Sequence, residues 1–85
     1  MKFKEKDYHH IFVKILKIKN TIKNKLYKKE TNIFLNNFNN WDSMTHVAIL
    51  TSIEKNFDIK VNHTNIKFFN NYISGLNYLK KLKKK

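Results

Sequence analysis

The sequence predicts an all-α fold, a small four-helix bundle with a long loop between its first and second helices. The chain has 85 residues and is 41% hydrophobic, which is enough for a single domain with a modest core. It contains no Pro and one Gly, Gly75, whereas β-rich folds depend on Gly and Pro in their turns. Its apolar residues recur at intervals of three and four, the period of an amphipathic helix.

The first helix is predicted to begin near Tyr8, with Asp7 as its N-cap, and to run to about Leu26. An apolar stripe with helical spacing supports this long helix and consists of Tyr8, Ile11, Ile15, Ile18, Ile22 and Leu26. We treat the chain as one domain over residues 1–85, and we expect residues 1–6 and 80–85 to be mobile basic ends.

A long loop is predicted over residues 29–41, because this stretch is rich in Asn, which favours turns over helix interiors. The second helix is then predicted to run from Ser43 to Asn56, with Asp42 as its N-cap. Its apolar face is predicted to contain Met44, Val47, Leu50 and Phe57. We interpret Trp41, at the helix entry, as a packing anchor.

The last third of the chain is predicted to hold an extended link and two further helices. Residues 57–61 alternate apolar and polar side chains, which suits a brief extended link. Asn62 can cap a short third helix through Ile66 and Phe68, and Asn70 or Asn71 can cap a fourth. Gly75 falls inside that fourth helix, where we interpret it as a site of close packing.

The formal net charge of +12 and the pI of about 10.0 suggest nucleic acid or an anionic membrane as a partner. However, all 18 basic residues are Lys, and Arg, the preferred residue for reading bases and phosphates, is absent. Residues 30–79 carry three Lys against four acidic residues. We therefore interpret the Lys runs as solvated faces and expect no stable nucleic-acid complex.

Other classes of protein are disfavoured by what the sequence lacks. No apolar run is long enough for a transmembrane segment, and the first ten residues do not resemble a signal peptide, so we expect a cytoplasmic protein. Without Cys there is no disulfide or thiolate metal site, and the four His residues lack the spacing of metal ligands. Asp42, Ser43 and His46 are the residue types of a hydrolase triad, but there is no Gly-x-Ser-x-Gly elbow. We expect no catalytic residue.

Three blocks of sequence resemble the acyl carrier protein family. Asp42-Ser43-Met44 is similar to the family's Asp-Ser-Leu at the start of the second helix, with Met a conservative replacement for Leu. The segment Glu54–Val61 reads EKNFDIKV and resembles the pattern Glu-x-x-Phe-x-Ile-x-Ile. The segment Asn71–Leu79 reads NYISGLNYL and resembles the fourth helix of the family. The resemblance covers residues 41–79 with matching intervals, and residues 1–40 match only in layout.

The resemblance implies a carrier rather than an enzyme, folded as a four-helix bundle of acyl-carrier type. Ser43 would be the attachment point of 4′-phosphopantetheine, transferred from coenzyme A by a phosphopantetheinyl transferase. The arm would carry an acyl or aminoacyl group as a thioester for acyl-activating or acyl-transferring enzymes, and the carrier is expected to be a monomer. By the same analogy, Asp42 helps the transferase to hold its metal ion and Met44 contacts the transferase. The family core, which would also shelter an acyl chain, corresponds here to Val47, Leu50, Phe57, Ile59, Ile66, Phe69, Ile73 and Leu76.

This chain departs from the family along the second helix, where members usually carry acidic residues that dock to basic partner enzymes. The surface expected to be exposed here offers Thr45, His46, Ile49, Ser52 and Lys55, with only Glu54 acidic. We therefore expect partner docking through Thr45, His46 and Ile49 in a specialised biosynthetic pathway with its own partners.

Two other interpretations remain open from the sequence. One is a small basic helical protein that binds nucleic acid through the Lys-rich first helix and tail, with Tyr8, Phe12 and Tyr27 nearby. The other is a carrier-like adaptor that is not modified, although the intact Asp42-Ser43 pair favours modification.

Overall fold

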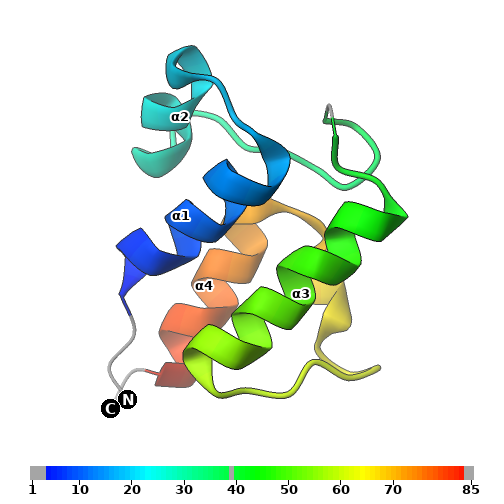
Figure 1. Cartoon of the computed structure of the whole chain (residues 1–85). Helices are drawn as coiled ribbons and strands as arrows, with labels where there is room; N and C mark the ends of the chain where they lie inside the picture. The colour runs from blue at the N-terminus through cyan, green and yellow to red at the C-terminus, as the bar shows by residue number, and fades with distance from the viewer. Residues whose placement is uncertain (1–3, 39, 84–85) are drawn as a thin grey trace.

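The computed structural model describes residues 4–38 and 40–83 and confirms the all-α prediction (Figure 1). Within those residues there is no β-strand, and a single isolated antiparallel bridge pairs Phe34 with Asn71. The elements in chain order are α1 Glu5–Leu16, α2 Asn20–Tyr27, α3 Ser43–Phe57, the 3₁₀-helix η1 Ile66–Asn70 and α4 Tyr72–Lys83.

The prediction of a single long first helix, made from the apolar stripe, is wrong because the segment forms two helices, α1 and α2. Lys17 adopts a left-handed backbone with φ 54°, and its N–H donates to the carbonyl of Val13, which ends α1. The N–H of Ile18 donates to the same carbonyl, over 3.2 Å. Ile18 stays buried across the break, so the spacing of apolar residues continues although the helix does not. Periodicity alone therefore could not reveal the break.

The start of α1 also differs from the prediction. Lys4 occupies the N-cap position without a side-chain cap, and Asp7 lies inside the first turn together with Glu5. An acidic residue in the first turn is stabilising because it faces the positive end of the helix dipole, so Asp7 does not need to be the cap. Of the ends expected to be mobile, residues 5 and 6 lie in α1 and residues 80–83 lie in α4, whereas residues 1–3 and 84–85 lie outside the described residues.

Glu5 links three parts of the fold. Its carboxylate accepts a hydrogen bond from Lys29, just after α2, and forms an ion pair with Lys80 of α4 at 3.2 Å. Partial burial works to raise the pKa of Glu5, but the hydrogen bonds and charges of the two lysines outweigh it and lower that pKa. Nearby, Nδ1 of His9 and the hydroxyl of Tyr72 are 2.9 Å apart. These contacts hold α1, the end of α2 and α4 together.

An aromatic cluster fills the centre of the core, where α1 packs against α3 and α4. The ring of Phe12 lies 5.4 Å from that of Trp41 and 5.1 Å from that of Tyr72, both edge to face. The Tyr8 ring lies 4.8 Å from that of Phe12, and its hydroxyl donates to the backbone carbonyl of Tyr72 over 2.7 Å. All four rings are buried, which confirms Trp41 as a packing anchor.

Helix α3 begins at Ser43 as predicted and ends one residue beyond the predicted end, but it buries a different face. Ile49, Ile53 and Phe57 are buried, whereas Val47 is 61% exposed and Met44 is 83% exposed. Apolar side chains at positions 44, 47, 48, 49, 50, 53 and 57 surround most of this helix, so the sequence offers two overlapping apolar stripes. Packing against α1 selects the stripe that contains Ile49 and Ile53. The expected core position of Val47 is therefore wrong, and Met44 does not share the buried face.

The predicted Asn-rich loop is present and is tied to α4 by its side chains. Oδ1 of Asn32 accepts the backbone N–H groups of Ile33 at 2.9 Å and Ile73 at 3.0 Å, while its Nδ2 donates to Asn71. Asn36 and Asn40 both have positive φ, a conformation that Asn tolerates better than most residues. Ile33 and Trp41 are buried, so the loop is anchored in the core near its start and at its end.

The predicted third helix is a 3₁₀-helix rather than an α-helix. Oδ1 of Asn62 accepts the N–H groups of Thr64 and Asn65, so Asn62 organises the turn before η1. Ile66, expected in the core, is 40% exposed and is a second wrong core assignment. Phe69, three residues further along, is fully buried and provides the core contact of this helix.

Helix α4 is capped by Asn71, as predicted, because Oδ1 of Asn71 accepts the N–H of Ser74 over 2.8 Å. Gly75 confirms the close-packing interpretation. A Cβ built on Gly75 would lie 2.5 Å from the Tyr8 hydroxyl and 2.9 Å from a ring carbon of Phe69. Only a residue without a side chain lets α4 approach α1 and η1 this closely.

Among the residues described, no helix combines the length and the apolar character that crossing a bilayer would require.

Candidate functional site

The start of α3 is organised by a capping box between Asp42 and Thr45. Oδ1 of Asp42 accepts the backbone N–H groups of Met44 and Thr45, each at 3.1 Å. In return, the hydroxyl of Thr45 accepts the N–H of Asp42 at 2.9 Å. This reciprocal arrangement satisfies backbone groups that a helix start would otherwise leave unpaired. The predicted role of Asp42 as N-cap is therefore confirmed.

The loop before the helix is held by further hydrogen bonds to the same turn. The Thr45 hydroxyl donates to the carbonyl of Asn40 over 2.5 Å, and the Asn40 side chain donates to the carbonyl of Leu16 over 3.2 Å. The capping turn is thus connected to the end of α1. The sequence analysis did not predict that Asn40 connects the capping turn to α1. The only indication in the sequence was a polar side chain two residues before the N-cap Asp42.

Ser43 is the first residue of α3 and is exposed to solvent between two other exposed side chains, Asp42 and Met44. No residue in the described part of the chain hydrogen-bonds the Ser43 hydroxyl. The structure therefore brings Asp42, Ser43 and Met44 together on the surface at the positive end of a 15-residue helix.

The pKa of the Asp42 carboxyl is lowered, chiefly by the backbone hydrogen bond from Thr45, with smaller contributions from the Thr45 hydroxyl and the Met44 N–H. Hydrogen bonds to the charged form favour ionisation. A carboxylate is therefore present beside Ser43 at neutral pH.

His46 and Ile49 do not belong to an exposed docking face, and this part of the prediction is wrong. His46 is 7% exposed and Ile49 is fully buried, because both lie on the stripe of α3 that faces the core. Thr45 is half-buried, and its hydroxyl is used by the capping box. The exposed side of the same helix instead presents Met44, Val47 and Lys55.

The geometry around His46 is incompatible with a Ser–His–Asp triad. Nδ1 of His46 accepts the indole N–H of Trp41 over 3.0 Å, which directs this nitrogen toward the core. Nε2 is buried and has no hydrogen-bond partner among the described residues. Burial lowers the pKa of His46. Neither ring nitrogen of His46 forms a hydrogen bond with the Ser43 hydroxyl, so His46 is not paired with it as a general base.

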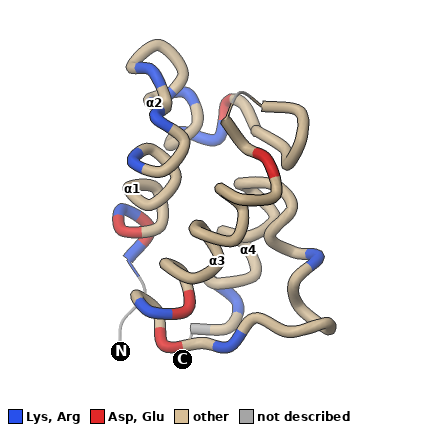
Figure 2. The backbone as a smooth tube through the Cα atoms, turned by 45° about the vertical axis from the view of Figure 1, so that its right-hand side comes forward, with Lys and Arg blue, Asp and Glu red and all other residues tan. Residues whose placement is uncertain are grey.

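The aromatic residues considered for nucleic-acid stacking are mostly inaccessible. Tyr8 and Phe12 are fully buried in the core, and of the three only Tyr27 is exposed. Basic residues are concentrated from the end of α1 through α2 to the start of the following loop, and again at the end of α4, whereas most of α3 is uncharged (Figure 2). In the part of the chain that the structure describes, no three His, Asp or Glu side chains gather as metal ligands.

Comparison with known proteins finds no matching family model, no matching curated protein and no matching solved structure.

Proposed function

We propose that this chain is a non-catalytic carrier protein that bears 4′-phosphopantetheine on Ser43. One observation carries the proposal: an exposed Ser opens a well-capped helix, beside an ionised Asp and an exposed Met. The resemblance of residues 41–79 to acyl carrier proteins adds support, because its first block falls on this turn.

The residues around Ser43 fit the proposed group. The hydroxyl is exposed and is not engaged by any described side chain, so a transferase can reach it. A phosphodiester on Ser43 would lie at the helix N-terminus, where the helix dipole favours negative charge. When attached, the group would supply the thiol that a chain without Cys lacks, and that thiol would carry an acyl or aminoacyl group as a thioester.

Asp42 and Met44 have separate roles in this proposal. The Asp42 carboxylate uses Oδ1 for the capping box, so the carboxylate is held in a fixed direction beside Ser43. In this proposal the carboxylate would help a phosphopantetheinyl transferase to hold its metal ion. The largely exposed Met44 side chain offers that enzyme an apolar contact.

The partners would be enzymes that do not depend on an acidic second helix. The exposed side of α3 carries Met44, Val47 and Lys55 and is not an acidic surface. We therefore propose acyl-activating or acyl-transferring partners of a specialised biosynthetic pathway.

Intact-mass spectrometry tests the proposal directly. The purified protein is incubated with coenzyme A, Mg²⁺ and a promiscuous phosphopantetheinyl transferase. We expect one phosphopantetheine to be added to the wild type and to Ser52→Ala, a matched change further along α3, and none to Ser43→Ala. Absence of addition from several transferases, with circular dichroism showing folded protein, would overturn the proposal and favour an unmodified adaptor.

A further inference from the structure

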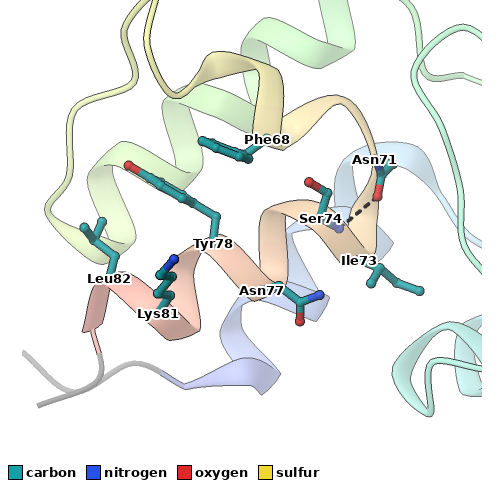
Figure 3. Close-up of a pocket in the computed structure, with 8 residues that line it drawn as sticks. All are labelled: Phe68, Asn71, Ile73, Ser74, Asn77, Tyr78, Lys81 and Leu82. Carbon is teal, nitrogen blue, oxygen red and sulfur yellow. Dashed lines mark hydrogen bonds between the residues drawn. The ribbon is translucent and has the colours of Figure 1, made fainter.

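An open groove of about 850 Å³ lies along the outer side of α4, where this helix meets η1 (Figure 3). Ser74, Asn77, Tyr78, Lys81 and Leu82 line it from α4, and Phe68 lines it from η1. The α4 positions follow the intervals of one helical face, so the groove runs along much of that helix. Twelve residues of α4 correspond to about 18 Å at the rise of an α-helix.

The groove has a preformed aromatic wall. The rings of Phe68 and Tyr78 are stacked, with centroids 4.8 Å apart and planes within 9° of parallel (Figure 3). Phe69 supports Tyr78 from the core, edge to face at 5.6 Å. The side chain of Asn65, itself buried, donates to the Tyr78 hydroxyl over 3.2 Å. A partner would therefore meet rings that are already ordered, which lowers the entropic cost of binding.

Apolar side chains lie at the two ends of this wall. Leu82 is 43% exposed at the C-terminal end of α4, and Ile73 is partly buried near its start. Exposed apolar surface in a groove with a polar rim is typical of a binding surface rather than of a solvated helix face. Asn77 and Ser74 provide that polar rim.

The lining of the groove contains no acidic residue. After Asp58 the sequence has no Asp or Glu, and its basic residues are Lys60, Lys67, Lys80, Lys81, Lys83, Lys84 and Lys85. Lys81 lines the groove itself. Nζ of Lys67 lies 5.5 Å from the centre of the Phe68 ring, close enough for a cation–π contact. The charge around the groove is therefore complementary to an acidic occupant.

We propose that the groove between η1 and α4 is the docking site for an acidic amphipathic helix of a partner protein. The apolar side of that helix would contact Phe68, Tyr78 and Leu82. Its flanking carboxylates would pair with Lys67 and Lys81. This is the helix-in-groove mode of recognition, in which residues at i, i+3, i+4 and i+7 provide the anchors. The site does not involve Ser43 and stands independently of the proposed modification.

The shape of the site favours a helix over a lipid or nucleic-acid surface. A groove lined by the stacked rings of Phe68 and Tyr78 can take up the apolar side chains of one helix. A flat membrane surface would instead contact the polar residues at the edge of the groove. Nucleic acid would gain its affinity from Lys contacts to phosphates and would leave the apolar ends of the groove unused.

Titration of the full-length ¹⁵N-labelled protein with a synthetic peptide tests the proposal. The probe is a 15-residue peptide with Leu at i, i+3, i+4 and i+7 positions and Glu on its outer side. Two controls are a scrambled peptide of the same composition without an apolar face, and a version with Gln in place of Glu. We expect amide shifts at Phe68, Asn77, Tyr78, Lys81 and Leu82, with at least tenfold weaker binding of both controls.

Charge-matched variants locate the site. Lys81→Glu in the groove and Lys14→Glu on the exposed side of α1 make the same change in net charge, and neither side chain is buried. We expect Lys81→Glu to weaken binding at least tenfold and Lys14→Glu to weaken it less than twofold. Leu82→Glu is a second groove variant and should also weaken binding.

Three results would overturn the proposal. The first is equal binding of the scrambled peptide, and the second is an equal effect of Lys14→Glu and Lys81→Glu; either would indicate unspecific attraction to a basic protein. The third is saturable binding of phosphatidylglycerol vesicles or single-stranded DNA at the same amides with no peptide binding. Retention of peptide binding by Ser43→Ala would support the site whatever the outcome for phosphopantetheine.

Discussion

The indole N–H of Trp41 donates a hydrogen bond to Nδ1 of His46 over 3.0 Å, between residues at either end of the capping turn. A nitrogen that accepts this bond carries no proton, so the neutral ring of His46 holds its proton on Nε2. That N–H is buried and has no partner among the described residues. The buried pair of Trp41 and His46 thus lies beneath the exposed residues Asp42, Ser43 and Met44, and the protonation state of His46 controls the hydrogen bond of that pair.

Acidification is expected to destabilise the protein through His46. Burial lowers the pKa of this residue, so the unfolded chain binds its proton at a higher pH than the folded protein. The free energy of unfolding contributed by His46 is therefore fully present above the unfolded pKa of about 6.5 and is lost as the pH falls below it. A difference of one bound proton between the unfolded and folded states changes the free energy of unfolding by at most about 1.4 kcal/mol per pH unit. Urea unfolding followed by the fluorescence of Trp41, the only Trp, measures it.

The variant His46→Gln should have a weaker pH dependence than the wild type between pH 7.5 and 5. Burial and nearby Lys23 also lower the pKa of His9, so part of the slope should remain in this variant. His10→Gln, at an exposed position, serves as the control. An unchanged slope in His46→Gln would contradict the assignment.

Gly75→Ala should be destabilising by roughly 1–3 kcal/mol, the usual cost of overpacking a core. Helix propensity alone would favour Ala by about 1 kcal/mol, so the sign of the effect separates packing from propensity. The added Cβ would lie 2.5 Å from the Tyr8 hydroxyl.

A double-mutant cycle identifies the clash at Gly75. Tyr8→Phe removes the nearest atom and also the 2.7 Å hydrogen bond to the Tyr72 carbonyl. The double variant should therefore be less destabilised than the sum of the two single changes, as measured by thermal unfolding. Strict additivity would mean that Phe69, 2.9 Å away, causes the clash instead.

Lys17→Gly should stabilise the protein by about 1 kcal/mol, because Lys17 has a left-handed backbone that costs a residue with a Cβ about that much. Lys14→Gly, one turn earlier in α1, should instead cost about 1 kcal/mol as a helix-interior glycine. Chemical denaturation of the two variants compares them. If both glycine variants are destabilised, Lys17 lies in a helix interior, and α1 and α2 form one continuous helix in solution.

Asp42→Asn should separate the structural role of Asp42 from its proposed role in modification. Asn also caps helices well, so the melting temperature should stay close to that of the wild type. Asp42→Ala removes the bonds to Met44 and Thr45 and should lower it. If the carboxylate helps the transferase, Asp42→Asn should be modified at least tenfold more slowly. Modification at the wild-type rate would assign Asp42 to capping alone.

The capping turn was predictable because it depends on local chemistry, and Gly75 indicated close packing without identifying its partners, Tyr8 and Phe69. An Asp at a helix start accepts N–H groups two and three residues away, and a glycine inside an apolar helix needs a packing reason. The same holds for Asn71 at the start of α4. The exposure of Ser43 also follows from its position at the capped end of α3.

Sequence patterns were enough to predict that the chain is helical, that Asp42 caps the helix beginning at Ser43, and that Trp41 packs into the core. The end of α1 at Leu16, and the burial of His46 and Ile49 on α3 while Val47 is exposed, became evident only in the folded structure. The physical reason is that spacing fixes which residues share a helical face, but several apolar stripes were available. Only packing against another helix selects one of them, and a left-handed residue can interrupt a helix without disturbing the spacing.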